Sequence, residues 1–220
     1  MSDLAAWVEA ETGHCPADIT LFERALTHSS RGGDDYERLE FLGDRVLGLV
    51  IASWVYARFA NESEGQLSRR LNVLVSRETC AEVARNTGLA PRMRLGKQAL
   101  EDGAGDSDNV LGDMVEALLG ALYLEGGIAA AETFVRRQWE SLIDEQRSAP
   151  QHPKSGLQEW AAANNRKPPE YRLVDRSGPQ HAPRFIVEVS VRGAGEAKAE
   201  GTSKQEAEKE AARLLLEKLG

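Results

Sequence analysis

Apolar residues recur at intervals of three and four positions through the first 143 residues of the chain. This spacing places them along one face of a helix, so the segment is expected to fold as a series of helices. Asn, Asp, Ser and Gly cluster at 61–65 and 102–106, where turns or loops are expected. The pattern predicts helices at Leu4–Glu11, Ile19–Leu26, Glu37–Phe59, Gln66–Val75, Arg77–Asn86, Asn109–Leu124 and Ala129–Ile143.

The pattern changes in the last third of the chain. Between 144 and 153 the apolar periodicity stops and Gln, Ser, Ala and Pro dominate, as in a linker. A helix is expected over Ser155–Asn164, with Ser155 as its N-cap, and a last helix runs from Ser203 to Leu219. Alternation with period two predicts half-exposed strands between them, at Tyr171–Asp175, Phe185–Val191 and Glu196–Glu200.

These elements predict a multidomain chain, which its length of 220 residues allows. An all-α domain is expected at 1–143 and a linker at 144–153. A small α+β domain with the order α-β-β-β-α is expected at 154–220.

The formal net charge of −8 argues, for the chain as a whole, against binding to nucleic acid. The charge is unevenly divided, however. Residues 1–150 hold 15 Lys and Arg against 25 Asp and Glu, whereas residues 151–220 hold 12 against 10. Lys97 is the one lysine before position 150, and six follow it. An acidic body with a mildly basic tail indicates two modules with different partners.

Composition narrows the class of protein further. A hydrophobic content of 41% and a charged content of 28% are typical of a globular chain. Met1–Glu11 is acidic and its apolar run is too short for a secretory signal, and the longest apolar run, Val46–Tyr56, is well short of a membrane span. Cys15 and Cys80 lack metal-ligand spacing. We expect a cytoplasmic protein with reduced cysteines, no membrane partner and no organic cofactor.

Three carboxylates share one side of the helix expected at Glu37–Phe59. Glu37, Glu40 and Asp44 stand at i, i+3 and i+7, within about 60° of one another at roughly 100° per residue. Like charges at this spacing destabilise a helix, which indicates a bound divalent cation or a proton to be moved. The opposite side is apolar and is expected to be buried; it carries Leu39, Leu42, Val46, Leu49 and Val50.

A second acidic pair, Asp113 and Glu116, again stands at i and i+3. Glu116 lies among apolar neighbours, an unfavourable place for a lone carboxylate. Two apolar helices, each carrying an acidic pair, can pack to form a four-carboxylate pocket that suits Mg²⁺ or Mn²⁺. Neither motif contains His or Cys, which disfavours zinc. Close approach of the two backbones would offset the cost of the helix glycines Gly43, Gly48, Gly112 and Gly120.

Structural roles compete with these assignments. A single Glu on a helix is usually a solvated surface charge. Placement at the positive end of the helix dipole explains Glu37 equally well, and capping or a first-turn position explains Glu64, in a Ser-Glu-Gly turn. For His28, a hydrogen-bonded position between helices is favoured over a catalytic one.

Four motifs along the first domain resemble the ribonuclease III family of double-stranded-RNA endonucleases. They are Ala25-Leu-Thr-His-Ser29, Glu37-Arg-Leu-Glu-Phe-Leu-Gly-Asp44, Glu64-Gly-Gln-Leu-Ser-Arg69 and Gly112-Asp-Met-Val-Glu-Ala-Leu-Leu-Gly-Ala121. The resemblance implies a homodimer in which each subunit cuts one strand of duplex RNA and leaves a 5′ phosphate and a 3′ hydroxyl. It covers nearly all of the first domain.

The same resemblance implies roles for the acidic residues. Glu40, Asp44, Asp113 and Glu116 match the carboxylates that bind Mg²⁺, for which Mn²⁺ can substitute. Of these, Asp44 and Glu116 match the residues of the hydrolytic step. Supporting acidic positions at the cleft and the dimer interface are matched by Glu37 and Glu64.

Residues 154–220 resemble a double-stranded-RNA-binding domain, which recognises the shape of A-form RNA through 2′-hydroxyls and phosphates. Its motifs are Leu157-Gln-Glu-Trp160, Pro169-Glu-Tyr171, Gly178-Pro-Gln-His181-Ala-Pro-Arg-Phe185 and Gly201-Thr-Ser-Lys204. The resemblance implies RNA contacts at Gln158, Glu159, His181, Ser203 and Lys204. Gln205 stands where a second Lys or Arg is usual, and an acidic helix follows it, so modest RNA affinity is expected.

The expected function is divalent-metal-dependent hydrolysis of double-stranded RNA, in the processing of ribosomal and other structured RNA precursors. The alternative is a non-catalytic duplex-RNA-binding protein on the same scaffold. The intact set of carboxylates argues against that alternative, because sequence drift usually removes such costly clusters once they have no use.

Overall fold

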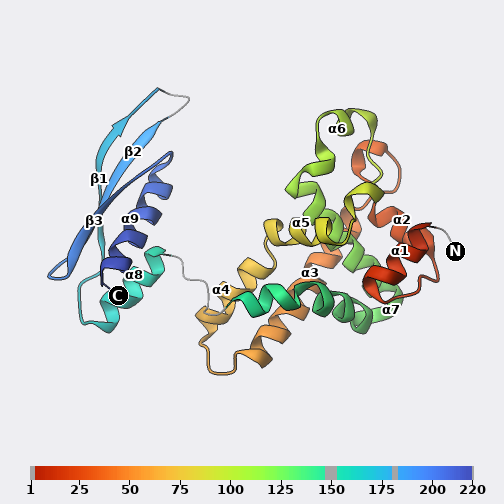
Figure 1. Cartoon of the computed structure of the whole chain (residues 1–220), viewed down its shortest axis with the longest axis horizontal. Coiled ribbons are helices and arrows are strands. Elements are labelled where there is room, and N and C mark those ends of the chain that lie inside the picture. Colours follow the sequence, from red (N-terminus) through yellow and green to blue (C-terminus); the bar gives the residue numbers. More distant parts are fainter. Residues whose placement is uncertain (1–2, 147–152, 180–182, 220) are drawn as a thin grey trace. The chain divides into compact units, whose positions relative to one another are not determined.

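The computed structural model describes residues 3–146, 153–179 and 183–219 of the chain. The chain divides into two compact units, Met1–Pro150 and Gln151–Gly220 (Figure 1). Each unit has a hydrophobic core of its own. Most of the linker expected at 144–153 falls on residues 147–152, which lie outside the described residues.

The described part of the first unit is helical. Glu64 and Gly65, expected in a turn, are instead the first residues of a helix, after the N-cap Ser63. A helix of five residues at Lys97–Glu101 was not expected, because it is too short to show a period. The α-helices are α1 (Asp3–Thr12), α2 (Ile19–Ala25), α3 (Glu37–Arg58), α4 (Glu64–Leu74), α5 (Arg77–Asn86), α6 (Lys97–Glu101) and α7 (Asp108–Glu145). Short 3-10 helices lie between them, η1 (Ser29–Arg31), η2 (Ala90–Arg92) and η3 (Ala104–Asp106).

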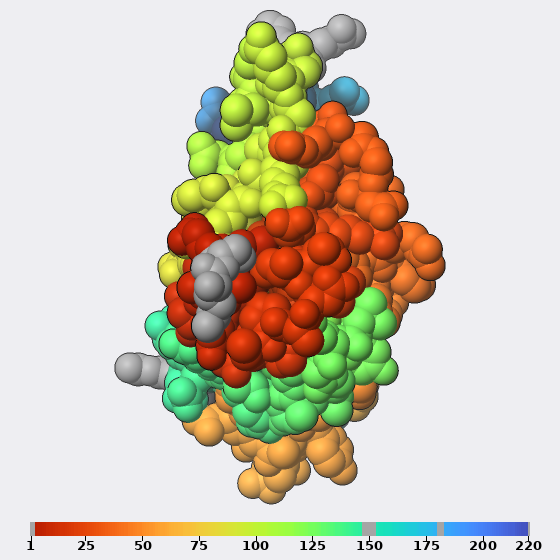
Figure 2. Space-filling view, turned by 90° about the vertical axis from the view of Figure 1, so that its right-hand side faces the viewer, coloured from red at the N-terminus to blue at the C-terminus, as the bar shows by residue number. Residues whose placement is uncertain are grey.

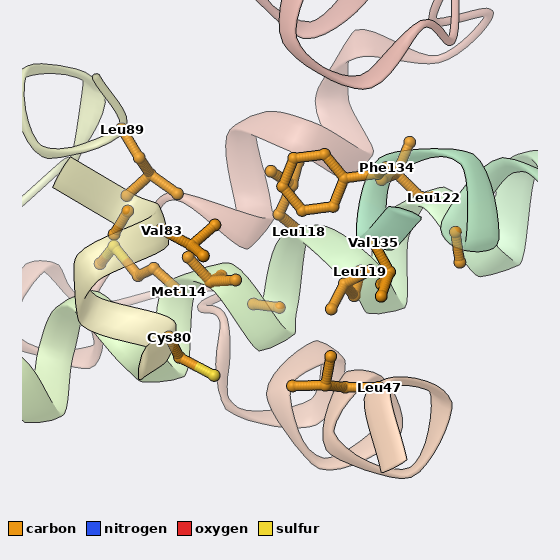
Figure 3. Packing of buried hydrophobic residues seen from close by; sticks show 14 of the residues in the cluster. Leu47, Cys80, Val83, Leu89, Met114, Leu118, Leu119, Leu122, Phe134 and Val135 are labelled. Atoms are coloured by element: carbon orange, nitrogen blue, oxygen red, sulfur yellow. The ribbon is translucent and has the colours of Figure 1, made fainter. Parts of the chain in front are cut away.

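The core of the first unit lies where α3 and α5 pack against α7. Figure 3 shows Leu47 of α3, Cys80 of α5 and Met114 of α7 among its buried side chains. Burial, followed by the charge of Glu116, raises the pKa of the Cys80 thiol to about 12, so this cysteine stays neutral. It behaves as a small apolar core residue.

The two helices expected at 109–124 and 129–143 join in α7. Gly127 interrupts the helical backbone with φ 67° and ψ −168°, a conformation that glycine adopts readily. Just before this break, the Glu125 carboxylate accepts hydrogen bonds from the backbone N–H groups of Ala17 (3.0 Å) and Asp18 (2.6 Å) and contacts the His14 ring. The α1–α2 segment therefore docks on α7, as the red and green surfaces of Figure 2 show.

Helix α7 is also, by length and composition, apolar enough to cross a membrane. Half of that apolar stretch is buried inside the protein, as in the central helix of a folded core. Helix α3, by contrast, carries exposed apolar side chains along one side. Leu49, expected to be buried, is 59% exposed, because it lies on a side of α3 that no other described element covers.

The second unit is a three-stranded antiparallel sheet with two helices. It contains α8 (Pro153–Ala163), β1 (Glu170–Ser177), β2 (Arg184–Val191), β3 (Gly195–Gly201) and α9 (Lys204–Leu219). The strand order is β1-β2-β3, and the register of β1 on β2 shifts between Leu173 and Asp175. Helix α9 packs on β2 and β3, and α8 packs on α9. The core between them includes Leu157, Val189 and Leu215.

Two expectations for this unit were wrong. Ser155 is not an N-cap, because α8 begins two residues earlier at Pro153. A proline suits the first position of a helix, where its missing N–H would have no partner within the helix. Strand β1 is exposed along nearly its whole length rather than half-exposed, because it forms an edge of the sheet away from α9.

Candidate metal centre

Three carboxylates from two helices meet in the first unit. Glu40 of α3 and Asp113 and Glu116 of α7 each offer a carboxylate oxygen, and these oxygens lie within 4.8 Å of one another. All three side chains are partly buried. They line a cavity of about 280 Å³ together with Asp44, Val75, Arg77 and Gly112.

Two glycines allow α3 and α7 to approach closely enough for this meeting. A Cβ atom at Gly43 would lie 1.6 Å from the Glu116 carbonyl oxygen, and one at Gly120 would lie 2.3 Å from the Leu39 carbonyl oxygen. The expectation of close helix packing is wrong for Gly48, where an added Cβ atom would meet no atom of another helix within 4 Å. Gly112 instead faces α5, with Arg77 and Cys80 as its neighbours.

Burial disfavours the ionised form of all three carboxyl groups, and the charge of neighbouring carboxylates adds to this effect for Glu40 and Glu116. Burial, followed by the charges of Asp113 and Glu40, raises the pKa of Glu116 to about 7. The pKa values of Glu40 and Asp113 are also raised, chiefly by burial. A divalent cation would offset this repulsion, and three carboxylate oxygens are the ligands that Mg²⁺ and Mn²⁺ prefer. The residues present therefore fit such an ion.

Asp44 holds a different position from the other three. It lines the same cavity, but its carboxylate is not among those that meet within 4.8 Å. Its side chain is 41% exposed and is paired with Arg45. Of the four expected metal ligands, the structure brings three together and leaves Asp44 at the rim.

The two supporting residues lie outside this cavity's lining. Glu37 is the first residue of α3 and is exposed, and its charge raises the pKa of Glu40. Glu64 is the first residue of α4, where its Oε1 accepts a hydrogen bond from Ser68 Oγ at 2.7 Å. Both positions agree with the helix-start interpretation, in which a carboxylate complements the helix dipole.

Sequence reasoning missed one partner of the cluster. Tyr36, the buried N-cap of α3, donates a hydrogen bond from its hydroxyl to Asp113 Oδ2 at 3.2 Å. The His28 ring packs against the Tyr36 ring, with centroids 5.6 Å apart. His28 itself caps η1, since its Nδ1 accepts from the Ser30 N–H at 3.1 Å. The signal available in the sequence was the place of Tyr36 directly before the acidic motif.

The expected RNA contacts of the second unit lie on α8 and at the start of α9. Gln158 and Glu159 are exposed on α8. Ser203 Oγ accepts a hydrogen bond from the Glu206 N–H at 3.1 Å, which caps α9, and Lys204 is exposed as the first residue of that helix. The fifth expected contact, His181, lies outside the described residues.

The acidic positions of α9 engage the nearby lysines. Glu208 accepts a hydrogen bond from Lys154 Nζ at 2.6 Å and lies 3.8 Å from Lys204 Nζ. A cavity beside the start of α9 is lined by Lys154, Ser203, Gln205, Glu206 and Lys209. Part of the positive charge of this surface is therefore neutralised within the unit.

A helical unit with a carboxylate cluster, followed by an α-β-β-β-α unit, defines a nuclease joined to a duplex-RNA-binding domain. A family model described as Ribonuclease-III-like matches residues 18–141, and one described as a double-stranded RNA binding motif matches residues 153–219. The chain belongs to the ribonuclease III family, which consists of divalent-metal-dependent endoribonucleases. The fold class expected from the sequence is confirmed.

Similar proteins cover both units. Ribonuclease 3 from Zymomonas mobilis is 59% identical over 212 residues, which span 96% of this chain and 86% of the relative. Ribonuclease 3 from Caulobacter vibrioides is 48% identical, over 97% of this chain and 95% of the relative. The crystal structure of the nuclease domain of ribonuclease III from Campylobacter jejuni is 32% identical, with a TM-score of 0.60 over 69% of this chain and 99% of that domain.

Proposed function

We propose that the chain hydrolyses double-stranded RNA with Mg²⁺, leaving 5′ phosphates and 3′ hydroxyls, and so matures ribosomal and other structured RNA precursors in the cytoplasm. The observation that carries this proposal is the meeting of Glu40, Asp113 and Glu116 within 4.8 Å, in the same chain as a duplex-RNA-binding motif. The all-oxygen donor set favours Mg²⁺ and also admits Mn²⁺.

Each side chain has a task in this reaction. When bound by Glu40, Asp113 and Glu116, the ion supplies Lewis acidity toward the phosphate and a nucleophilic water. Burial and the neighbouring carboxylates raise the pKa of Glu116 to about 7 in the metal-free protein, so this group would release its proton when it binds the ion. Asp44 lines the same cavity, and in this proposal it accepts a proton from the attacking water or completes the ligand set.

The test is incubation of the purified full chain with long duplex RNA, with and without Mg²⁺. The RNA should be cut only when Mg²⁺ is present, and the products should carry 3′ hydroxyls. The variant Glu116→Gln keeps the shape of the side chain but removes its charge, so it should stop cutting while RNA is still retained in a gel shift. Intact RNA in all lanes would overturn the enzyme assignment in favour of a non-catalytic duplex-RNA-binding protein. Loss of RNA retention in the variant would make Glu116 structural.

A homodimer is part of the proposal. Helix α3 exposes large apolar side chains along one side, with Phe41 64%, Leu49 59% and Tyr56 74% exposed. Beside them lies a cavity of about 570 Å³, lined by Leu21, Leu42 and Leu124 among others. An exposed apolar patch of this kind marks a protein interface. The nuclease domain of ribonuclease III from Campylobacter jejuni, a similar solved structure, has structural flexibility in a region involved in dimer formation.

Light scattering after size exclusion tests the homodimer. The wild type should have the mass of two chains, and Phe41→Asp should shift it toward one. Leu100→Asp is the matched control, since Leu100 is 63% exposed on α6, away from α3. A monomeric wild type would contradict the proposed dimer, as would a dimer that both substitutions leave unchanged.

A further inference from the structure

One basic side chain faces the acidic cavity and has no role in the reaction described so far. Arg77, the first residue of α5, lines the cavity with Glu40, Asp44, Asp113 and Glu116. It is the one basic residue among those lining residues, and it is exposed.

The stem of Arg77 is held in place beside the carboxylates. A Cβ at Gly112 would lie 3.4 Å from the Arg77 carbonyl oxygen and 3.5 Å from Arg77 Cγ, so the stem packs on the bare backbone of Gly112. Gly112 directly precedes Asp113. The stem of the arginine therefore lies against the residue that precedes a proposed metal ligand.

The guanidinium of Arg77 is available to an outside group. Among the described residues it forms no ion pair, whereas Arg45 on α3 is paired with Asp44, and Arg85 on the same helix is paired with Asp108 at 2.5 Å. The charge of Arg77 reaches the cluster, since it lowers the pKa values of both Asp113 and Glu116. Four carboxylates around one cavity would otherwise repel an RNA phosphate.

We propose that Arg77 binds the scissile phosphate of duplex RNA and draws it into the acidic cavity. A guanidinium can donate two parallel hydrogen bonds to the non-bridging phosphate oxygens, and its charge stabilises the charge that develops on them during hydrolysis. This inference rests on the proposed function, because it assigns the contact to the phosphate that is cut. Arg77 would then be a residue that touches the substrate rather than one that binds the metal.

Two measurements on the full chain carrying Arg77→Gln test this assignment. The value of kcat/KM on duplex RNA at saturating Mg²⁺ should fall roughly 10-fold, less than the loss for a buried oxyanion donor. In a Glu116→Gln background, which is expected to bind without cutting, the slope of log affinity against log salt should become shallower by about one. Arg77→Lys should restore the slope and only part of kcat/KM, because a lysine keeps the charge without the fork.

Controls separate this role from a structural one. Arg85→Gln removes the same charge from the same helix outside the cavity, and it should leave kcat/KM within about twofold, as expected for an exposed ion pair. Binding of Tb³⁺ to the RNA-free protein should be no weaker in Arg77→Gln, because a nearby positive charge has been removed. Weaker Tb³⁺ binding in Arg77→Gln, together with cutting that extra Mg²⁺ restores, would overturn the phosphate contact. A kcat/KM for Arg77→Gln as close to the wild type as that of Arg85→Gln would also overturn it. A wild type that cuts no RNA would instead overturn the proposed function.

Discussion

Glu116 shows at the scale of one residue how burial and charge prepare a metal ligand. It stands among apolar neighbours on α7, and the two carboxylates nearest to it add like charge. Both effects disfavour the ionised form, which is why its pKa lies near 7 rather than at 4.5. The folded, metal-free protein therefore binds a proton at this site over a pH range in which the unfolded chain has released it.

This difference predicts a pH-dependent stability. A raised folded-state pKa stabilises the fold below the unfolded value of 4.5, and that contribution is lost as the pH rises through about 7. The metal-free protein should therefore melt at a lower temperature at about pH 8 than at about pH 5.5, and Mg²⁺ should raise Tm more at the higher pH. Thermal unfolding with EDTA or Mg²⁺ measures this. Glu116→Gln carries no titrating group and should flatten the profile; an equally steep profile in the variant would contradict the assignment.

Tyr36 gives a second prediction at this scale. Its hydroxyl holds Asp113 Oδ2 at 3.2 Å, so it fixes the rotation of a carboxylate that faces Glu40 and Glu116. Tyr36→Phe keeps the buried ring and removes only the hydrogen bond, and the Mg²⁺ concentration for half-maximal cutting should rise on the order of 10-fold. Tyr171→Phe is the matched control, since it removes a buried hydroxyl in the second unit. An unchanged Mg²⁺ requirement for Tyr36→Phe would contradict the orienting role.

Contact between two helix backbones sets the site at the scale of elements. A methyl group at Gly43 would fall 1.6 Å from the Glu116 carbonyl oxygen, so α3 and α7 would have to separate. Gly43→Ala should lower the free energy of unfolding by at least about 1–3 kcal/mol, because backbone atoms cannot move aside as side chains can. It should also weaken metal binding, since the ligands come from both helices. Urea unfolding and Tb³⁺ titration measure the two effects.

The same helix contains a control for this prediction. Gly48 has no atom within 4 Å of its would-be Cβ, and its backbone is helical. Gly48→Ala should therefore stabilise the protein by roughly 0.5–1 kcal/mol, the usual gain from removing a glycine inside a helix. Two Gly→Ala changes on one helix are thus expected to have opposite signs. Destabilisation of equal size at both positions would show that the close approach at Gly43 does not limit the packing.

The sequence predicted most elements of this fold because apolar periodicity is a local signal. It foresaw α3 and α7 and the acidic pairs on them, since spacing alone determines which residues share a face. It failed where a position depends on what lies across from it. Leu49 fits the apolar period yet has no described neighbour to cover it, and Asp44 fits the acidic stripe yet lies outside the cluster. Tyr36 and Arg77 belong to no periodic pattern, and the place of Tyr36 directly before the acidic motif does not reveal its partner, so the folded contacts identify their roles.

The whole molecule combines two units that differ in the charge of the surfaces proposed to contact RNA. The first unit is acidic around a cavity of carboxylates, and the second carries lysines beside the start of α9. Some of those lysines are already paired with Glu208, which reduces the number of phosphates that the second unit can neutralise. The cavity carboxylates and the duplex-RNA-binding motif thus belong to units with separate cores. Because one chain joins the two units, RNA that is bound by one unit is concentrated at the other.

Removal of residues 151–220 tests this division of labour. The remaining unit has its own core and all of the cavity carboxylates, so it should fold and show the far-UV circular dichroism of a helical protein. It should also cut duplex RNA in a Mg²⁺-dependent manner at low salt. Its affinity for the duplex should fall on the order of 10-fold or more at about 0.15 M salt, because the tethered binding unit is gone.

Gel shifts with Glu116→Gln versions of both lengths measure affinity without cutting. The matched control is the full chain with both Lys204→Ala and Gln158→Ala, which keeps both cores. Its affinity for the duplex should lie between those of the full and the truncated chain, and its kcat at saturating RNA should be unchanged. Equal affinity at both lengths would mean that the second unit does not hold the substrate, and a truncated form without activity at low salt would place part of the active site there.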